Sequence, residues 1–261
     1  MKKILFFDID GTLVSETTHT IPSSAIKALN KAKEQGHLLF INTGRPKASI
    51  SKLITDLPID GYICGCGTYI EYQNKVIYHH QVDNNRVKEI KQLITQYNIE
   101  PVFESSNNIY FNKDVKQPLV KQIKEDYIKN KFNVLDIDDN LQFDKFTLWY
   151  QGDISSFRDN ISKDFEIIDR ANDMLEIMPL NHSKANGISK VVDLLNQDLD
   201  NCYVFGDSFN DESMLRYVKH SVVMGNGEEA LKEFAYFVAR DIEDDGILDA
   251  LIKLKLIEKE A

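Results

Sequence analysis

The chain has 261 residues, a hydrophobic fraction of 43% and a formal net charge of −10 at pH 7. Nucleic acids and anionic membranes bind clustered lysine and arginine side chains, so this charge argues against both as partners. No apolar stretch approaches the roughly 20 residues that span a bilayer, and the N-terminus lacks the features of a signal peptide. We therefore expect a cytoplasmic protein. The sequence does not indicate its oligomeric state.

Several common metal and nucleotide motifs are missing from the sequence. The three cysteines, Cys64, Cys66 and Cys202, form neither a disulfide framework nor the paired spacing of a zinc site. The acidic runs beginning at Asp8 and Asp241 do not match the frame of a calcium-binding EF-hand loop. No Walker phosphate loop is present. The chemistry of the chain must therefore come from another kind of site.

The first part of the chain alternates apolar strands with helices. Pro22 opens a helix that ends at Gly36, and Pro46 can start the next helix. The strands predicted here cover residues 3–9, 38–41, 62–64, 69–72 and 75–78. The last two form a predicted hairpin.

Between residues 82 and 181 the pattern changes to an α+β unit with an open sheet. The helices predicted here cover residues 85–97, 115–130 and 154–162. The predicted strands cover residues 101–104, 109–112, 145–151, 165–169 and 174–178. Several of them alternate apolar with polar residues, as a sheet with one covered face does.

After Pro179 the alternation of helices and strands resumes. Helices are predicted at 183–196, 211–217 and 246–256, and strands at 202–205 and 221–224. This alternation predicts a doubly wound parallel sheet, whose ligands bind beyond the carboxyl ends of the strands. Asp8, Thr43 and Asp207 each lie just past such an end.

Two aspartates follow the first strand directly. Residues i and i+2 of a strand point the same way, so Asp8 and Asp10 should share one small space, and Gly11 lets the backbone fold closely around it. At about 4 Å, two like charges in a partly buried site cost roughly 4 kcal/mol. The pair therefore predicts a bound cation.

Further polar residues complete a set: Thr43-Gly44, Lys184, and the loop that contains Asp207, Asn210 and Asp211. In this order the motifs resemble those of the haloacid dehalogenase-like (HAD) phosphohydrolases, most closely their Cof-type branch. The runs at 223–227 and 243–247 also resemble that branch, as does the position of the large insert. In one departure, Cys66 stands where the branch usually carries an asparagine, which affects the expected substrate preference.

The resemblance implies a fold and a division into domains. Residues 1–81 and 182–261 would form a Rossmann-like α/β core with a doubly wound parallel sheet. Residues 82–181 would form an inserted α/β cap that selects the substrate and closes over it.

The resemblance also implies the chemistry. Asp8 would be the nucleophile that forms an aspartyl-phosphate, and Asp10 the general acid and base. The ligands of a Mg²⁺ ion would be the carboxylates of Asp8 and Asp207 and the backbone carbonyl of Asp10, with Asp211 orienting the water ligands of the metal. The residues that bind the substrate phosphate would be Thr43, Gly44, Lys184 and Asn210.

We therefore expect a Mg²⁺-dependent phosphatase of small phosphorylated metabolites. Sugar phosphates are the first candidates, with pyridoxal phosphate or flavin mononucleotide as others by family analogy. Two alternatives stay open. A phosphomutase would use the same core but protect its aspartyl-phosphate from water, and a metabolite-binding regulator would bind phosphoesters without turnover.

Overall fold

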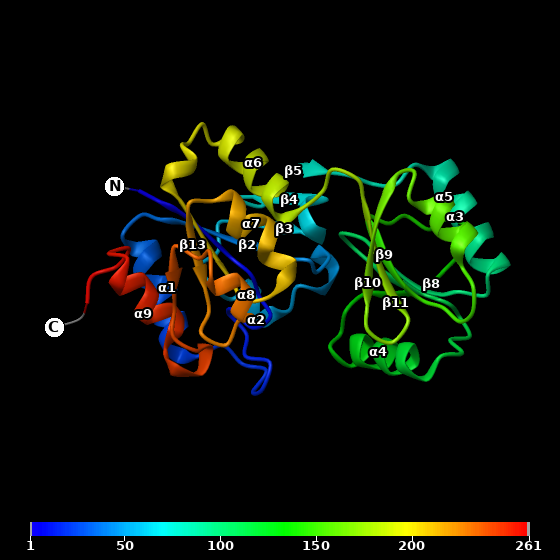
Figure 1. Cartoon of the computed structure of the whole chain (residues 1–261), viewed down its shortest axis with the longest axis horizontal. Helices are drawn as coiled ribbons and strands as arrows, with labels where there is room; N and C mark the ends of the chain where they lie inside the picture. Colours follow the sequence, from blue (N-terminus) through cyan, green and yellow to red (C-terminus); the bar gives the residue numbers. More distant parts are fainter. Residues whose placement is uncertain (1, 260–261) are drawn as a thin grey trace. The chain divides into compact units, whose positions relative to one another are not determined.

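The computed structural model describes residues 2–259, whose helices and strands are drawn in Figure 1. The chain forms two compact units. One, which we call the core unit, comprises the chain up to Gly44, Ser51–Ile77, and the chain from Ser183 onward. The other, which we call the insert unit, comprises Arg45–Ile50 and Tyr78–His182.

The sheet of the core unit runs in the order β14-β13-β12-β1-β2-β3-β4-β5. Its strands are β1 (Ile4–Phe7), β2 (Leu38–Asn42), β3 (Gly61–Cys64), β4 (Tyr69–Tyr72), β5 (Lys75–His79), β12 (Cys202–Gly206), β13 (His220–Val223) and β14 (Phe237–Val238). Neighbours from β14 to β3 pair in parallel, and β4 pairs antiparallel with β3. Every residue of β1, β2 and β3 is buried, as in a parallel sheet covered on both faces.

Helices cover both faces of this sheet. They are α1 (Ser23–Glu34), α2 (Lys52–Thr55), α6 (Lys184–Leu194), α7 (Glu212–Tyr217), α8 (Glu229–Lys232) and α9 (Gly246–Lys253). Helices α1 and α9 pack together on one face, and α6 and α7 pack together on the other (Figure 1). The predicted doubly wound α/β fold is therefore confirmed.

The parallel register brings the ends of the central strands to one edge of the sheet. Ile4 of β1 lies opposite Cys202 of β12 on one side and Leu38 of β2 on the other. The chain leaves these three strands at residues 8, 207 and 43. Segments from distant parts of the sequence thus meet at this edge.

The insert unit has its own sheet, in the order β10-β11-β9-β6-β7-β8. Its strands are β6 (Glu100–Glu104), β7 (Ile109–Phe111), β8 (Val134–Asp136), β9 (Lys145–Trp149), β10 (Phe165–Arg170) and β11 (Met174–Pro179). Its helices are α3 (Asn84–Gln96), α4 (Pro118–Lys129) and α5 (Ser155–Ile161). All its strand pairs are antiparallel except β7 with β8.

The two faces of this second sheet bury different sets of residues. Phe146 and Leu148 of β9 point to one face, where they belong to a large apolar cluster with residues of α3 and α5. Trp149 belongs to a smaller cluster that includes Val120 of α4. The period-2 alternation along β9 therefore separates the two cores.

The two ends of the main segment of the insert unit meet. The hydroxyl of Tyr78 and Nε2 of His182 form a hydrogen bond of 2.8 Å. The rings of His80 and His182 lie with their centroids 4.6 Å apart. The chain thus enters and leaves this segment at neighbouring points.

A few elements differ from the sequence-based predictions. The helix expected after Pro46 is a single 3₁₀ turn at Lys47–Ser49, followed by extended backbone and the short α2. Helix α4 starts at Pro118 instead of residue 115, because a residue before proline avoids the helical conformation. Among residues 2–259, no helix combines the length and apolar character needed to cross a membrane.

Candidate active site

Asp8 is the first residue after β1. Its backbone N–H donates to the carbonyl oxygen of Phe205 at 3.0 Å, which continues the parallel pairing with β12 by one residue. Only 2% of its surface is exposed. Asp10, two residues later, is half-buried in a tight turn in which the N–H of Gly11 donates to the carbonyl of Val14. The turn keeps both aspartates at the edge of the sheet.

Gly11 is required in this turn for two reasons. Its φ of +77° lies in the left-handed region, which side chains disfavour. A Cβ atom here would also lie 2.3 Å from Oδ2 of Asp207. The glycine therefore lets the carboxylate of Asp207 approach the backbone of the first loop.

Lys184 is the first residue of α6, after the N-cap residue Ser183, whose side chain accepts a hydrogen bond from the N–H of Asn186. A lysine in this position opposes the helix dipole, which favours anions at the N-terminus. Its Nζ donates to Oδ1 of Asp8 at 2.6 Å and to Oδ1 of Asp211 at 2.5 Å. The two ion pairs with buried carboxylates thus outweigh the unfavourable interaction of Lys184 with the helix dipole.

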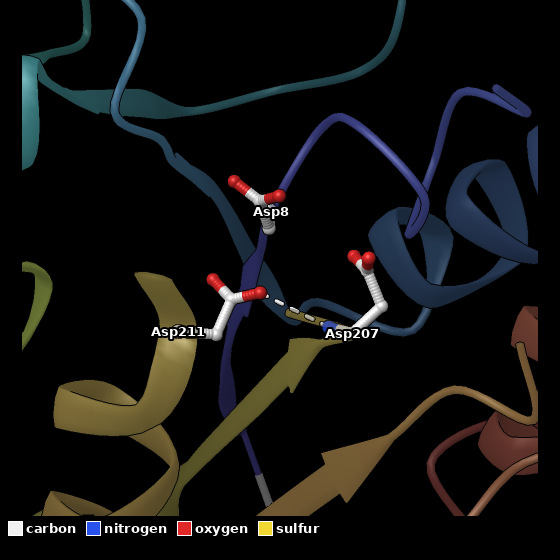
Figure 2. Close-up of side chains that lie close together, drawn as sticks. All are labelled: Asp8, Asp207 and Asp211. Atoms are coloured by element: carbon white, nitrogen blue, oxygen red, sulfur yellow. Dashed lines mark hydrogen bonds between the residues drawn. The ribbon is translucent and has the colours of Figure 1, made fainter. Parts of the chain in front are cut away.

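The loop after β12 supplies the other carboxylates. Oδ2 of Asp211 accepts from the backbone N–H groups of Asp207 (3.0 Å) and Ser208 (3.2 Å), which fixes the loop around a short 3₁₀ turn. Figure 2 shows the first of these bonds and the three aspartates that lie together. Asn210, from the same turn, accepts a 3.2 Å hydrogen bond from Nζ of Lys184.

The carboxylates of Asp8, Asp207 and Asp211 form one buried cluster. Each contributes one oxygen, and these oxygens all lie within 4.8 Å of one another. Burial, followed by the charge of Asp211, raises the pKa of Asp8 to about 8. Burial also raises the pKa of Asp207 to about 7, although the hydrogen bond from Thr12 opposes this shift. The cluster is therefore short of positive charge.

Lys184 provides part of the missing charge. Burial disfavours its charged form, but Asp211 and Asp8 outweigh this effect and raise its pKa above the usual value. With all three carboxylates ionised, the single ammonium would leave two negative charges uncompensated. Clustered carboxylate oxygens with this excess suit a hard divalent cation such as Mg²⁺.

Thr43 and Gly44 follow β2 and contact the loop after β3, which contains Cys66. The carbonyl of Thr43 accepts from the N–H of Cys66 at 3.1 Å, and a Cβ on Gly44 would lie 3.5 Å from Sγ of Cys66. Cys66 adopts a left-handed conformation with φ of 53°. Cys66 thus lies against the Thr43-Gly44 turn.

The sequence-based prediction missed three residues that hold the site in shape. Oγ1 of Thr12 donates to Oδ1 of Asp207 at 2.7 Å. Asn226 donates to the carbonyl of Gly11 and accepts from the N–H of Ile242, so it joins two loops. Asn42 donates to the carbonyl of Lys184 at 3.1 Å. Thr12 directly follows Gly11 and Asn226 lies in the run 223–227, but nothing in the local sequence indicates their partners.

Comparison with known proteins places these features in context. The sequence profile of a family described as haloacid dehalogenase-like hydrolases matches residues 5–251. YkrA of Bacillus subtilis is 29% identical over 270 residues, which cover 98% of this chain and 99% of that protein. The pyridoxal phosphate phosphatase YbhA of Escherichia coli is 27% identical over 267 residues, which cover 94% of this chain and 96% of that protein.

A solved structure of a phosphatase from the same superfamily is also similar to this chain. The HAD subclass IIB sugar phosphatase BT4131 superposes with a TM-score of 0.80 and 31% sequence identity. The match covers 98% of this chain and all of that one. The likeness therefore extends over both units.

Proposed function

The chain belongs to the haloacid dehalogenase-like hydrolases as a phosphoric monoester hydrolase, and we propose that it hydrolyses small phosphorylated metabolites through an aspartyl-phosphate on Asp8. The observation that carries the proposal is the buried cluster of Asp8, Asp207 and Asp211 around Nζ of Lys184. In this proposal the nucleophile and the cation site lie at one edge of a parallel sheet, where ligands of doubly wound folds bind.

A Mg²⁺ ion would be held by the carboxylates of Asp8 and Asp207 and by the backbone carbonyl of Asp10. The donor set fits this ion, because it consists of oxygens with an excess of negative charge. When bound, the ion supplies positive charge next to the transferring phosphoryl group. Asp211, fixed by Asp207 and Ser208 backbone N–H groups, would orient water ligands of the metal.

The reaction divides into two steps on this chain's own residues. An oxygen of Asp8 attacks phosphorus, the bond from phosphorus to the ester oxygen breaks, and Asp10 donates a proton to the departing oxygen. A water molecule then attacks the aspartyl-phosphate and gives its proton to Asp10. Asp8 and inorganic phosphate are released. Each proton lost in one step is recovered in the other.

The substrate phosphate needs donors that match its oxygens. Lys184 contributes a charged group, Asn210 an amide, Thr43 a hydroxyl and Gly44 a backbone N–H. Fixed donors of this kind stabilise the charge that spreads over the equatorial oxygens in the transition state. Lys184 would exchange one of its hydrogen bonds to Asp8, Asn210 and Asp211 for one to the phosphate.

Sugar phosphates are the first substrates that we propose. BT4131 is described as a sugar phosphatase and YbhA as a pyridoxal phosphate phosphatase, and the chain resembles both along nearly its whole length. In this proposal residues 82–181 select the substrate. Pyridoxal phosphate and flavin mononucleotide are the other candidates.

The test is phosphate release from a panel of sugar phosphates, pyridoxal phosphate and flavin mononucleotide, with Mg²⁺ and with EDTA. We expect release that needs Mg²⁺, and its profile would identify the substrate class. Asp207→Asn should raise the Mg²⁺ concentration required. Isomerised sugar phosphate without free phosphate would instead indicate a mutase. Binding without any turnover would indicate a regulator, and either result would overturn the proposal.

A further inference from the structure

A concave site lies wholly within the insert unit. It is a pocket of about 310 Å³ where β6 begins and β9 ends, next to the start of α4. Its walls include Glu100, Asn112, Asp114, Gln117, Trp149 and Tyr150. Its volume is at the lower end of the range of about 300–1,000 Å³ for ligand pockets. The pocket therefore suits a small molecule.

Two polar atoms in the wall of this pocket are buried without a hydrogen-bond partner. They are Nε1 of Trp149 and Oε1 of Gln117. Trp149 is only 5% exposed, so its indole N–H is largely withdrawn from solvent. Native proteins pair most buried polar groups, and those without a protein partner usually meet water or a ligand. Both groups belong to side chains of the pocket wall but are covered from solvent, so a ligand can pair them only if the wall shifts to uncover them.

Glu100 adds a buried carboxylate to the same wall. It lies directly opposite Trp149 in the antiparallel pair β6–β9 and is 9% exposed. Its oxygens accept from Nδ2 of Asn112 at 2.6 Å and from the N–H of Lys116 at 3.0 Å. Within residues 2–259 it forms no ion pair, whereas Glu104, at the other end of the same strand, pairs with Lys145.

The combination favours a ligand whose groups both donate and accept hydrogen bonds. An acceptor must reach the indole N–H of Trp149, and a donor must reach the carboxylate of Glu100. Hydroxyl groups meet both needs, and aromatic side chains such as Tyr150 present apolar surface to C–H groups. We propose that this pocket binds an uncharged polyhydroxylated molecule the size of a monosaccharide.

The charge of the pocket argues against a phosphorylated ligand. Glu100 and Asp114 line it together with a single cation, Lys116. A phosphate dianion would meet more carboxylates than ammonium groups there. The site would therefore take free sugars or polyols and not the phosphoesters proposed as substrates. It does not depend on the proposed hydrolysis.

The chain contains a single tryptophan, so its indole fluorescence comes from the wall of this pocket. The experiment is a titration of its fluorescence in the full-length protein with glucose, ribose and inositol. Putrescine and inorganic phosphate serve as the cationic and anionic probes. Each titration is repeated with Glu100→Gln, with Asp139→Asn as an exposed control in the same unit, and with Asp8→Asn as a control for the active site.

We expect a saturable change with at least one neutral sugar, about tenfold or more weaker in Glu100→Gln and unchanged in both controls. Circular dichroism would establish that each variant is folded, and calorimetric titration of Trp149→Phe would give a second measure of lost affinity. Saturation only with putrescine would overturn the ligand class. No saturation with any neutral sugar, or saturation that Asp8→Asn abolishes, would overturn the site.

Discussion

The two units each bury a lysine among carboxylates, but the charges balance in one cluster and not in the other. In the core unit Lys184 meets Asp8 and Asp211 at 2.6 and 2.5 Å, with Asp207 in the same cluster. In the insert unit Lys145 meets Glu104 at 3.1 Å and Glu176 at 2.9 Å, and Glu176 also pairs with Arg170. The first cluster has three acids for one base, and the second has two of each.

The difference appears in the pKa values of the acids. Lys145 is the main cause that lowers the pKa of Glu176 to about 2, against the effect of burial, although burial raises the pKa of Glu104 in the same cluster. In the core unit, burial raises the pKa of Asp8 to about 8, and one lysine does not reverse this. A buried cluster with equal numbers of acids and bases supports the fold. A buried cluster with an excess of acids suits the binding of a further cation.

The largest effect should follow from Asp8→Asn. The variant keeps the shape of the side chain but removes the nucleophile, so we expect phosphate release to fall on the order of 10⁴-fold or more. Because the high pKa of Asp8 shows that its charge is unfavourable without metal, the melting temperature in EDTA should not fall. Asp56→Asn, at an exposed acid of the core unit, is the control. Substantial residual turnover would remove Asp8 from its proposed role.

The two lysines offer a direct comparison. Lys184→Met should reduce turnover about 10³-fold through the loss of a charged donor to the phosphate. Lys145→Met should leave the buried carboxylate of Glu104 unpaired and Glu176 with Arg170 as its remaining ion-pair partner, and reduce the free energy of unfolding by about 3–5 kcal/mol. Added Mg²⁺ should restore stability to the first variant and not to the second. Equal rescue of both, measured by thermal unfolding, would contradict the contrast between the clusters.

Glu176→Gln tests the balanced cluster through pH. The folded-state pKa of Glu176 is lowered from 4.5 to about 2, so its contribution to stability is present above 4.5 and is lost as pH falls towards 2. The variant should be less stable by about 3 kcal/mol at neutral pH, and the difference should vanish near pH 2. Denaturant unfolding at several pH values measures it. Asp169→Asn, an exposed partner of Arg158, should show little change.

The smallest effect concerns Thr12, which orients Asp207 through a 2.7 Å hydrogen bond. Thr12→Val removes the hydroxyl and should raise the Mg²⁺ concentration for half-maximal activity about 10–100-fold. Turnover at saturating Mg²⁺ should change less. Thr12→Ser keeps the hydroxyl donor, so its Mg²⁺ concentration for half-maximal activity should equal that of the unmodified protein. If the role of Thr12 were purely steric, Thr12→Ser would not behave in this way.

Elements with a strong local signal could be predicted from the sequence. The apolar runs of β1 and β2 are buried throughout, and the hairpin turn has Gln73 and Asn74 in the left-handed region that such turns require. Strand β8 could not be predicted, because Val134–Asp136 is largely exposed and carries no apolar alternation. Local patterns thus predicted the buried strands and missed the edge strand β8 of the second sheet.

The candidate site was predictable as far as its residues follow strand ends. The structure brings Asp8, Lys184, Asn210, Asp207 and Asp211 together, and their catalytic roles stay predictions. The partners of the supporting residues could not be derived, since they depend on contacts between distant segments. Thr12 and Asp207 are separated by 195 positions, for example. Such pairs are set by how the loops pack and not by any local pattern.

The hydrogen bond between Tyr78 and His182 has a consequence for modularity. A segment whose two ends lie side by side can be removed, exchanged or transplanted without stretching the scaffold that receives it. Residues 79–181 therefore form one continuous exchangeable segment, which leaves Arg45–Ile50 of the insert unit on the receiving scaffold. Chimaeras joined at these two positions would allow the insert of one relative to be carried on the scaffold of another.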